Sequence, residues 1–102
     1  MLAQFSVFPI GSHGTSLRAP VAKAIQEIDK TGIKYRVTDM GTILEGDWDA
    51  VMRALKAVHD RILSQSDRVY MTVSIDDRKD KAMTLDSKVR AVEQAVGKKL
   101  GA

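Results

Sequence analysis

Apolar residues repeat along this chain with two different spacings, and the order of these spacings restricts the possible folds more than any other feature. Alternation of apolar and polar residues is typical of strands with one buried face, and four segments show it: 2–10, 33–38, 42–45 and 68–76. Apolar residues every three or four positions are typical of amphipathic helices, and three segments show them: 20–30, 48–62 and 85–96. We therefore expect strand, helix, strand, strand, helix, strand and a final helix.

That order predicts an α+β fold of the ferredoxin-like βαββαβ type, a sandwich in which two helices pack on one face of a four-stranded antiparallel sheet. The C-terminal helix is additional. The 102 residues, 44% of them apolar and 28% charged, have the size and composition of one globular domain, so we expect residues 1–102 to form one. The face without helices would be open, and we expect a second copy to cover it in a homodimer or homotetramer, a dimer of dimers.

Capping residues predict where the helices begin and end. Gly32 follows the first helix and offers the left-handed conformation that stops it. Asp47 precedes the second helix and Thr84 the third, and both are typical N-cap residues. Because Trp48 and Met52 lie on the apolar stripe of the second helix, we expect both in the core.

The composition limits where the chain works and what it binds. With no cysteine it can form no disulfide and no thiolate metal site, which suits the reducing cytoplasm. Residues 1–8 lack the basic start of a signal peptide, and no segment approaches the ~20 apolar residues of a membrane span. The net charge is +3, but the lysines and arginines are spread along the chain among 13 acidic residues and form no basic run. Residues 42–45 also lack the aromatic side chains of an RNA-binding sheet. We expect a cytoplasmic protein that binds no membrane, with nucleic acid a minor alternative.

The loop 9–16 is rich in glycine and hydroxyl groups and leads into the first helix. Backbone N–H groups and the positive end of a helix dipole can hold an anion or a polar ring at such a place. The loop lacks the Gly-Lys-Ser/Thr ending of a phosphate-binding P-loop. An ordinary turn followed by a helix cap is the alternative to ligand contact.

A second candidate motif, residues 39–46, places Thr42 and Glu45 on a short strand between two glycines. A strand glutamate flanked by apolar residues is costly to bury without a partner. Glu45 is therefore either solvated at a sheet edge or paired with a ligand or a cation.

A third candidate motif, residues 76–81, crowds charges of both signs at the end of the last strand. Asp76 and Asp77 could hold a metal ion or a cationic ring, and Arg78 could hold a phosphate. The spacing does not match a calcium-binding EF-hand loop, and a solvated charged turn is the alternative.

Catalysis has little support in the sequence. No serine lies in a G-x-S-x-G elbow, and His13 and His59 have no second histidine or carboxylate at metal-ligand spacing. An acylphosphatase-like enzyme would need an asparagine, and the chain has none. We expect a protein that is not an enzyme and that holds no metal or cofactor.

Taken together, these motifs give the whole chain a resemblance to the small thiamine-binding protein family, which is related to the YkoF-like proteins. The motifs that carry it occur in the family's order along nearly the full length. They are residues 7–11, 32–35, 40–46 and 73–81, followed by the helix 88–96.

The resemblance implies a ferredoxin-like domain that assembles into dimers or tetramers and binds thiamine or its hydroxymethylpyrimidine part without chemistry. An aminopyrimidine offers donors and acceptors that carboxylates and hydroxyls can match, and a thiazolium cation suits an aromatic face such as Tyr70 or Phe8. The alternative is a structural or regulatory oligomer that docks another protein on its open sheet face. The residues carried over as ligand-binding candidates are Gly11, Ser12, Thr42, Glu45, Asp76 and Arg78.

Overall fold

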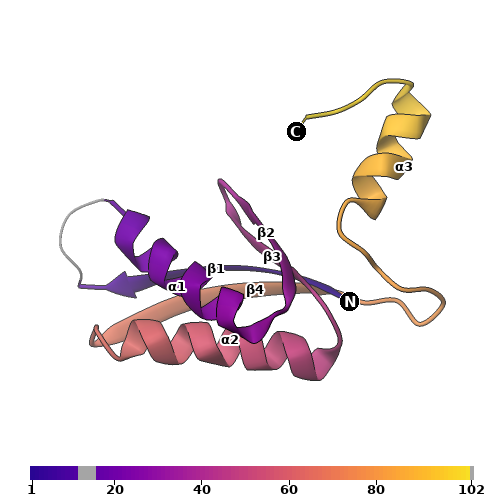
Figure 1. Cartoon of the computed structure of the whole chain (residues 1–102). Helices are drawn as coiled ribbons and strands as arrows, with labels where there is room; N and C mark the ends of the chain where they lie inside the picture. The colour runs from indigo at the N-terminus through magenta and orange to yellow at the C-terminus, as the bar shows by residue number, and fades with distance from the viewer. Residues whose placement is uncertain (12–15, 102) are drawn as a thin grey trace.

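The computed structural model describes residues 1–11 and 16–101 and contains the predicted elements in the predicted order (Figure 1). The strands and helices are β1 (Leu2–Ile10), α1 (Arg18–Thr31), β2 (Lys34–Thr38), β3 (Gly41–Glu45), α2 (Trp48–Leu63), β4 (Arg68–Asp76) and α3 (Ser87–Val96).

The four strands form one antiparallel sheet in the order β2-β3-β1-β4. β1 pairs with β4 over its full length, from Leu2 opposite Asp76 to Ile10 opposite Arg68. The β2–β3 hairpin adds to the other side of β1, and α1 and α2 lie on one face of the sheet (Figure 1). This arrangement confirms the ferredoxin-like prediction.

The core lies between the sheet and these two helices. Ala3, Phe5 and Val7 point from β1 toward the helices and are buried, as their alternation predicts. Burying a side chain of the size of Val or Phe contributes about 1.5–3 kcal/mol, so the stripe of α2 is a major source of stability. Its buried residues are Val51, Ala54, Leu55, Val58 and Ile62.

The ends of α1 and α2 are as the capping residues predict. Gly32 has φ 76° and closes α1. The Asp47 carboxylate accepts a hydrogen bond from the Ala50 N–H at 2.8 Å at the start of α2. The prediction that Trp48 belongs to the core is wrong: it is 58% exposed, because it opens the helix and the buried stripe begins one turn later. Met52 packs against the core in part.

The predicted start of the last helix is also wrong. Thr84 was expected as N-cap and Leu85 on the stripe, but α3 begins at Ser87, and Asp86 before it has φ 70°. The Leu85 N–H donates instead to the side chain of Glu45 on the sheet. The backbone before α3 is therefore held by the sheet and cannot join the helix.

α3 stands apart from the body formed by the sheet, α1 and α2 (Figure 1). None of its ten residues, all of them described, is buried, and its stripe of Val89, Val92 and Val96 is exposed. The radius of gyration is 15.2 Å, whereas a compact domain of about 100 residues has about 13 Å. Within the described part of the chain, no helix has the length and apolar character needed to cross a membrane.

Candidate ligand site on the open sheet face

A row of charged residues crosses one end of the sheet face that carries no helix. Glu45 and Asp76 both lie opposite Leu2, one from each side of β1, and Lys34 lies opposite Glu45. Since Ala3 and Leu44 point into the core, their neighbours in the row point to the open face. Two strand spacings place the two carboxylates about 10 Å apart. The structure therefore brings together two of the predicted ligand residues.

The segment 83–88 is fixed across this end of the sheet, and we call it the latch segment. The Leu85 N–H donates to Glu45 Oε1 at 2.7 Å. Lys88 Nζ lies 3.8 Å from the Asp76 carboxylate. Met83 and Leu85 are buried, which adds apolar contact to the polar ones. Glu45 is therefore not simply solvated, and it does not depend on a ligand for a partner, because the Leu85 N–H of the same chain donates to it.

One oxygen of Glu45 remains available. The side chain is 22% exposed, and Lys34 Nζ lies 3.9 Å from Oε1. In the hydrogen bonds among the described residues Glu45 uses only Oε1. Its second oxygen, Oε2, can therefore accept a hydrogen bond from a ligand while the latch segment stays in place.

Arg36 and Asp86 form the third contact of the latch segment. Arg36 of β2 donates to the Asp86 carboxylate. This hydrogen bond, with the positive charges of Arg36, Arg90 and Lys34, holds the pKa of Asp86 below its ordinary value of 3.8, although desolvation opposes it. The same contact raises the pKa of Arg36. Both groups are therefore charged at neutral pH, and the latch segment is held electrostatically.

A cleft of about 850 Å³ lies between α3 and the open face beside the β2–β3 hairpin. This volume is within the range of about 300–1,000 Å³ that is usual for small-molecule sites. Its lining mixes apolar and charged groups from both sides, which are Arg36, Thr38 and Ile43 on the sheet and Asp86, Lys88, Val89, Arg90, Val92, Glu93, Lys99, Leu100 and Gly101 in and around α3.

An aromatic pair and a hydroxyl pair lie further along β1 and β4 on the open face. Phe8 and Tyr70 stack with ring centroids 5.4 Å apart and an interplanar angle of 26°. Ser6 and Thr72 share a hydrogen bond of 2.8 Å between their hydroxyls. All four belong to β1 and β4, so one continuous surface presents an aromatic face, hydroxyls and the charged row.

Thr42 is separated from Glu45 by the sheet itself. Its side chain lies on the helix side opposite Phe5 and is only 5% exposed. It lines a different, smaller cavity of about 240 Å³ between α1 and the hairpin. Arg78 lies beyond the end of β4 and pairs through two nitrogens with Asp80.

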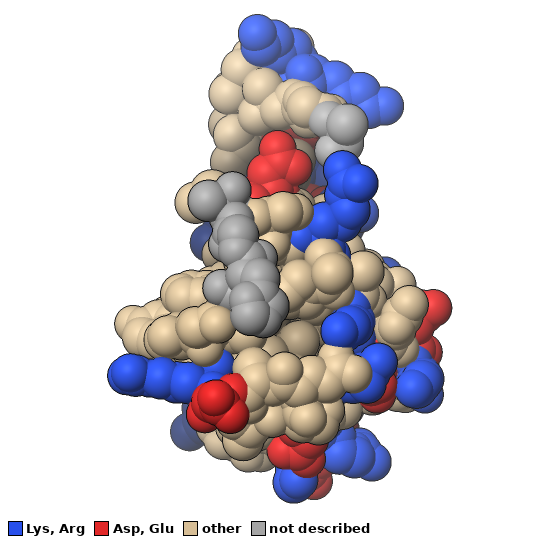
Figure 2. Space-filling view, turned by 90° about the vertical axis from the view of Figure 1, so that its left-hand side faces the viewer, with Lys and Arg blue, Asp and Glu red and all other residues tan. Residues whose placement is uncertain are grey.

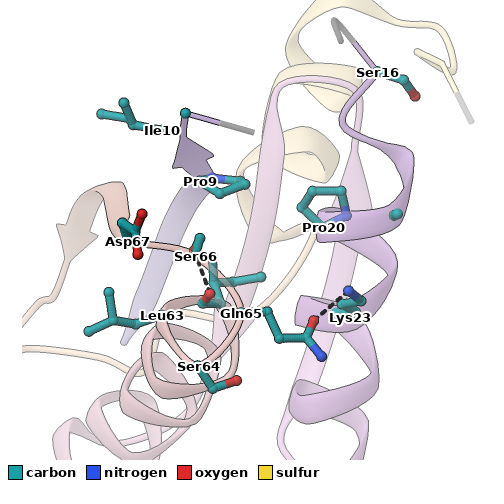
Figure 3. Close-up of a pocket in the computed structure, with 13 residues that line it drawn as sticks. Pro9, Ile10, Ser16, Pro20, Lys23, Leu63, Ser64, Gln65, Ser66 and Asp67 are labelled. Atoms are coloured by element: carbon teal, nitrogen blue, oxygen red, sulfur yellow. Dashed lines mark hydrogen bonds between the residues drawn. The ribbon is translucent and has the colours of Figure 1, made fainter. Parts of the chain in front are cut away.

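Gly11 lies at the far end of β1 and lines a third cavity, of about 830 Å³ (Figure 3). Its φ of 85° is a conformation that favours glycine. Lys23 of α1 reaches Gln65 after α2 across this cavity, among the polar side chains that Figure 3 labels. Ser12 lies outside the described residues. One chain alone therefore does not gather the six candidates around one cavity.

The cleft beside α3 contains residues that the sequence analysis missed. Ile43 was assigned only to its strand, and Val89 and Val92 only to a helix stripe. The available signal was that stripe, since α1 and α2 already cover one face of the sheet and the third helix needs a different apolar partner. Among the described residues no cluster of acidic or histidine side chains could hold a metal ion.

Basic and acidic side chains alternate over the visible face of the main body (Figure 2).

The sheet order, the two helices on one face and the open face opposite define a ferredoxin-like α+β protein. A model of the family described as "Thiamine-binding protein" matches residues 3–93, and the chain belongs to this family. This confirms the resemblance that the sequence motifs indicate.

Relatives and solved structures agree with this membership. A UPF0045 protein of Methanothermobacter thermautotrophicus is 42% identical over 96 residues, which are 92% of this chain and 97% of the relative. The crystal structure of the hypothetical protein MJ1052 of Methanocaldococcus jannaschii superposes with a TM-score of 0.83 at 39% identity, covering 91% of this chain and 95% of that one. A Thermotoga maritima protein, described with a proposed role in thiamine biosynthesis or salvage, has a TM-score of 0.77 at 23% identity and covers 89% and 96%. That likeness supports the fold alone.

Proposed function

We propose that this chain, acting as one cytoplasmic domain, binds thiamine or a related hydroxymethylpyrimidine compound without chemistry, at a subunit interface of a homo-oligomer. The family and the geometry of the open face support this proposal. The observation that carries it is the cleft of about 850 Å³ between α3 and the open sheet face, which is lined by Arg36, Ile43 and Val92 among others. A second copy that covers the open face would close it.

Groups on the open face and in the cleft match the chemistry of such a ligand. Glu45 Oε2 can accept a hydrogen bond from the amino group of an aminopyrimidine. Ile43 and Val92 offer apolar contact to the faces of the ring. The stacked Phe8 and Tyr70 lie six residues along β1 from Leu2, which is about 20 Å, so a ligand held by Glu45 of the same chain does not reach them. None of these groups is a nucleophile paired with a base, which favours binding over catalysis.

The other five predicted ligand-binding residues belong to the proposal as well, and each is tested separately. Asp76 shares the charged row with Glu45 and can contribute to the same site. Gly11, Ser12, Thr42 and Arg78 would belong to the site only where a second copy or another region of the surface brings them near the ligand. Substitution of each one separately, followed by titration, tests its part.

The second candidate function is a structural or regulatory oligomer that docks another protein on its open face. The exposed stripe of Val89, Val92 and Val96 favours this candidate, because a helix of this kind normally covers an apolar surface. The two candidates differ in what a titration with a small molecule gives.

Calorimetric titration of the purified oligomer with thiamine and with hydroxymethylpyrimidine tests the proposal. Glu45→Gln retains a carbonyl oxygen for the Leu85 N–H but removes the charge offered to the ligand. A hydrogen bond to a charged group is worth about 1.5–3 kcal/mol, so we expect about 10- to 100-fold weaker binding.

Asp49→Asn is the matched control, since it makes the same carboxylate-to-amide change on an exposed residue of α2, on the other side of the sheet. We expect its affinity to equal that of the original protein. Flat titrations with both compounds on folded oligomer would reject the binding proposal and favour the docking candidate.

A further inference from the structure

The cleft between α3 and the open sheet face is lined by more basic than acidic side chains. The basic ones are Arg36, Lys88, Arg90 and Lys99, and the acidic ones are Asp86 and Glu93. The cavity beside Gly11 has one lysine and one aspartate in its lining, and the smaller cavity beside Thr42 has a single aspartate among its described residues. Of these three cavities, the cleft therefore has the excess of positive charge.

Both acidic groups of the cleft already have partners within the chain. The Asp86 carboxylate accepts a hydrogen bond from Arg36. The charge of Arg90 acts on the same carboxylate and lowers its pKa, in addition to the larger effect of Arg36. Glu93 Oε2 accepts a hydrogen bond from the Leu100 N–H at 2.6 Å. The negative charges of the cleft are thus in use and do not neutralise all of the positive ones.

Two of the basic side chains are exposed and available. Among the described residues, Arg90 and Lys99 take part in no ion pair, whereas Arg36 pairs with Asp86. A second hollow of about 440 Å³ shares Arg90 and Lys99 and adds Lys98. Figure 2 shows Lys and Arg side chains gathered at the end of the molecule that α3 and the residues after it form. An anion could therefore reach Arg90 and Lys99 without displacing an internal partner.

The charge of the cleft discriminates between forms of the proposed ligand. Thiamine carries only the positive charge of its thiazolium ring, which these side chains repel. A phosphate ester carries about 1.5–2 negative charges at pH 7, and an arginine guanidinium can donate two parallel hydrogen bonds to it.

Glu45 lies close enough to this cleft for one ligand to use both. It is two positions from Ile43 on the same face of β3, which is about 7 Å, and Ile43 lines the cleft. A ligand whose ring is bound at Glu45 can therefore extend its other end into the cleft.

We propose that the cleft takes the phosphate group of a phosphorylated ligand, a phosphate ester of thiamine or of hydroxymethylpyrimidine, through Arg90 and Lys99. This inference rests on the proposed function and names the charged form of the ligand that the function requires. Glu45 binds the ring at one end, and the two basic side chains bind the phosphate at the other. Arg36 stays paired with Asp86 and keeps α3 beside the sheet.

Calorimetric titration with four compounds tests the inference at one ionic strength. They are thiamine, thiamine monophosphate, hydroxymethylpyrimidine and its phosphate. A partly exposed ion pair is worth up to about fivefold in affinity, so two pairs should make a phosphate ester about 5- to 25-fold tighter than its alcohol. The pair of compounds that shows this preference identifies the ligand. Binding of the alcohols with no preference for either phosphate would overturn the inference and leave the proposed function standing.

The double variant Arg90→Gln with Lys99→Gln removes both charges from an exposed surface. We expect the preference for the phosphate to fall to about twofold or less, and the affinity for the thiamine cation to rise. Arg90→Lys alone retains the charge and should keep most of the preference. Arg53→Gln with Lys56→Gln is the matched control, because both residues are exposed on α2, on the other side of the sheet. A preference that persists in the double variant, or that the control loses equally, would overturn the inference.

Inorganic diphosphate is a probe that contains no pyrimidine. We expect it to bind the original protein at low salt and to bind the double variant about 5- to 25-fold more weakly. This loss would support the phosphate site even if thiamine and hydroxymethylpyrimidine both failed to bind, which separates the inference from the proposed function. Equal diphosphate binding by the two proteins, or none by either, would overturn the inference.

Discussion

α2 and α3 are both amphipathic helices, but they use their apolar stripes in opposite ways. The stripe of α2 is buried against the sheet, whereas Val89, Val92 and Val96 of α3 are exposed. α2 is capped by Asp47 and packs along its length, while α3 is attached through the polar contacts of the latch segment. The same periodicity therefore predicts a helix in both places but does not say whether its partner lies in the same chain. Each of the following predictions tests that difference.

One substitution made in both helices should give the largest contrast. Val58→Ala in α2 removes two buried methyl groups and leaves a cavity, so we expect a loss of about 2–3 kcal/mol in the free energy of unfolding. Val92→Ala in α3 should change it by less than about 0.5 kcal/mol. Urea denaturation at low protein concentration measures both. Equal losses would show that α3 packs within its own chain.

Removal of the Glu45 carboxylate should release α3 without loosening α2. Glu45→Ala deprives the Leu85 N–H of its acceptor, and a hydrogen bond to a charged group is worth about 1.5–3 kcal/mol. We expect about 10- to 100-fold faster hydrogen exchange at Leu85, measured by mass spectrometry. Amides in the middle of α2 serve as the control and should exchange as before. Faster exchange in both places would mean that Glu45 supports the whole fold.

The pKa of Asp86 should report the latch contact directly. Arg36 lowers this pKa, so the contact stabilises the folded state above the unfolded pKa of 3.8 and is lost as the pH falls through the lower folded value. In Arg36→Gln we expect the Asp86 titration, followed by NMR, to move up toward 3.8. Asp60 on α2, whose pKa is lowered by Lys56 and His59, should titrate unchanged. An unmoved Asp86 would assign its lowered pKa to its other cationic neighbours.

The smallest effect is expected at Trp48, at the exposed start of α2. Trp48→Ala should cost less than about 1 kcal/mol in the free energy of unfolding, although tryptophan is the largest side chain. The fluorescence of this single tryptophan should also have the long emission wavelength of a solvated ring. A loss of several kcal/mol would place Trp48 in the core after all.

The fold could be predicted from local patterns because alternation and capping act over a few residues. Phe5, Val58 and Asp47 each behave as their neighbours in the sequence indicate. The start of α3 could not be predicted, because the acceptor for the Leu85 N–H comes from Glu45, 40 positions away. Propensity at Thr84 was overridden by a tertiary contact.

The candidate site could be predicted only in part. Glu45 and Asp76 come together because both lie opposite Leu2, a register that no single motif contains. Thr42 and Glu45 are three residues apart on one strand, so the period of two already sends their side chains to opposite faces. The motif 39–46 was treated as one unit without asking which face each side chain takes, which is why Thr42 was grouped with Glu45.

The contacts of the latch segment make the attachment of α3 dependent on the salt in the solution. These contacts through Arg36, Asp86, Asp76 and Lys88 join partly exposed charges, and dissolved ions weaken such attractions as the Debye length shortens from about 10 Å at 0.1 M to about 3 Å at 1 M ionic strength. The apolar layer beneath the opposite face is strengthened by excluded salts such as sulfate. Added sulfate therefore weakens the contacts that hold α3 on one side of the sheet and strengthens the burial of the core on the other side.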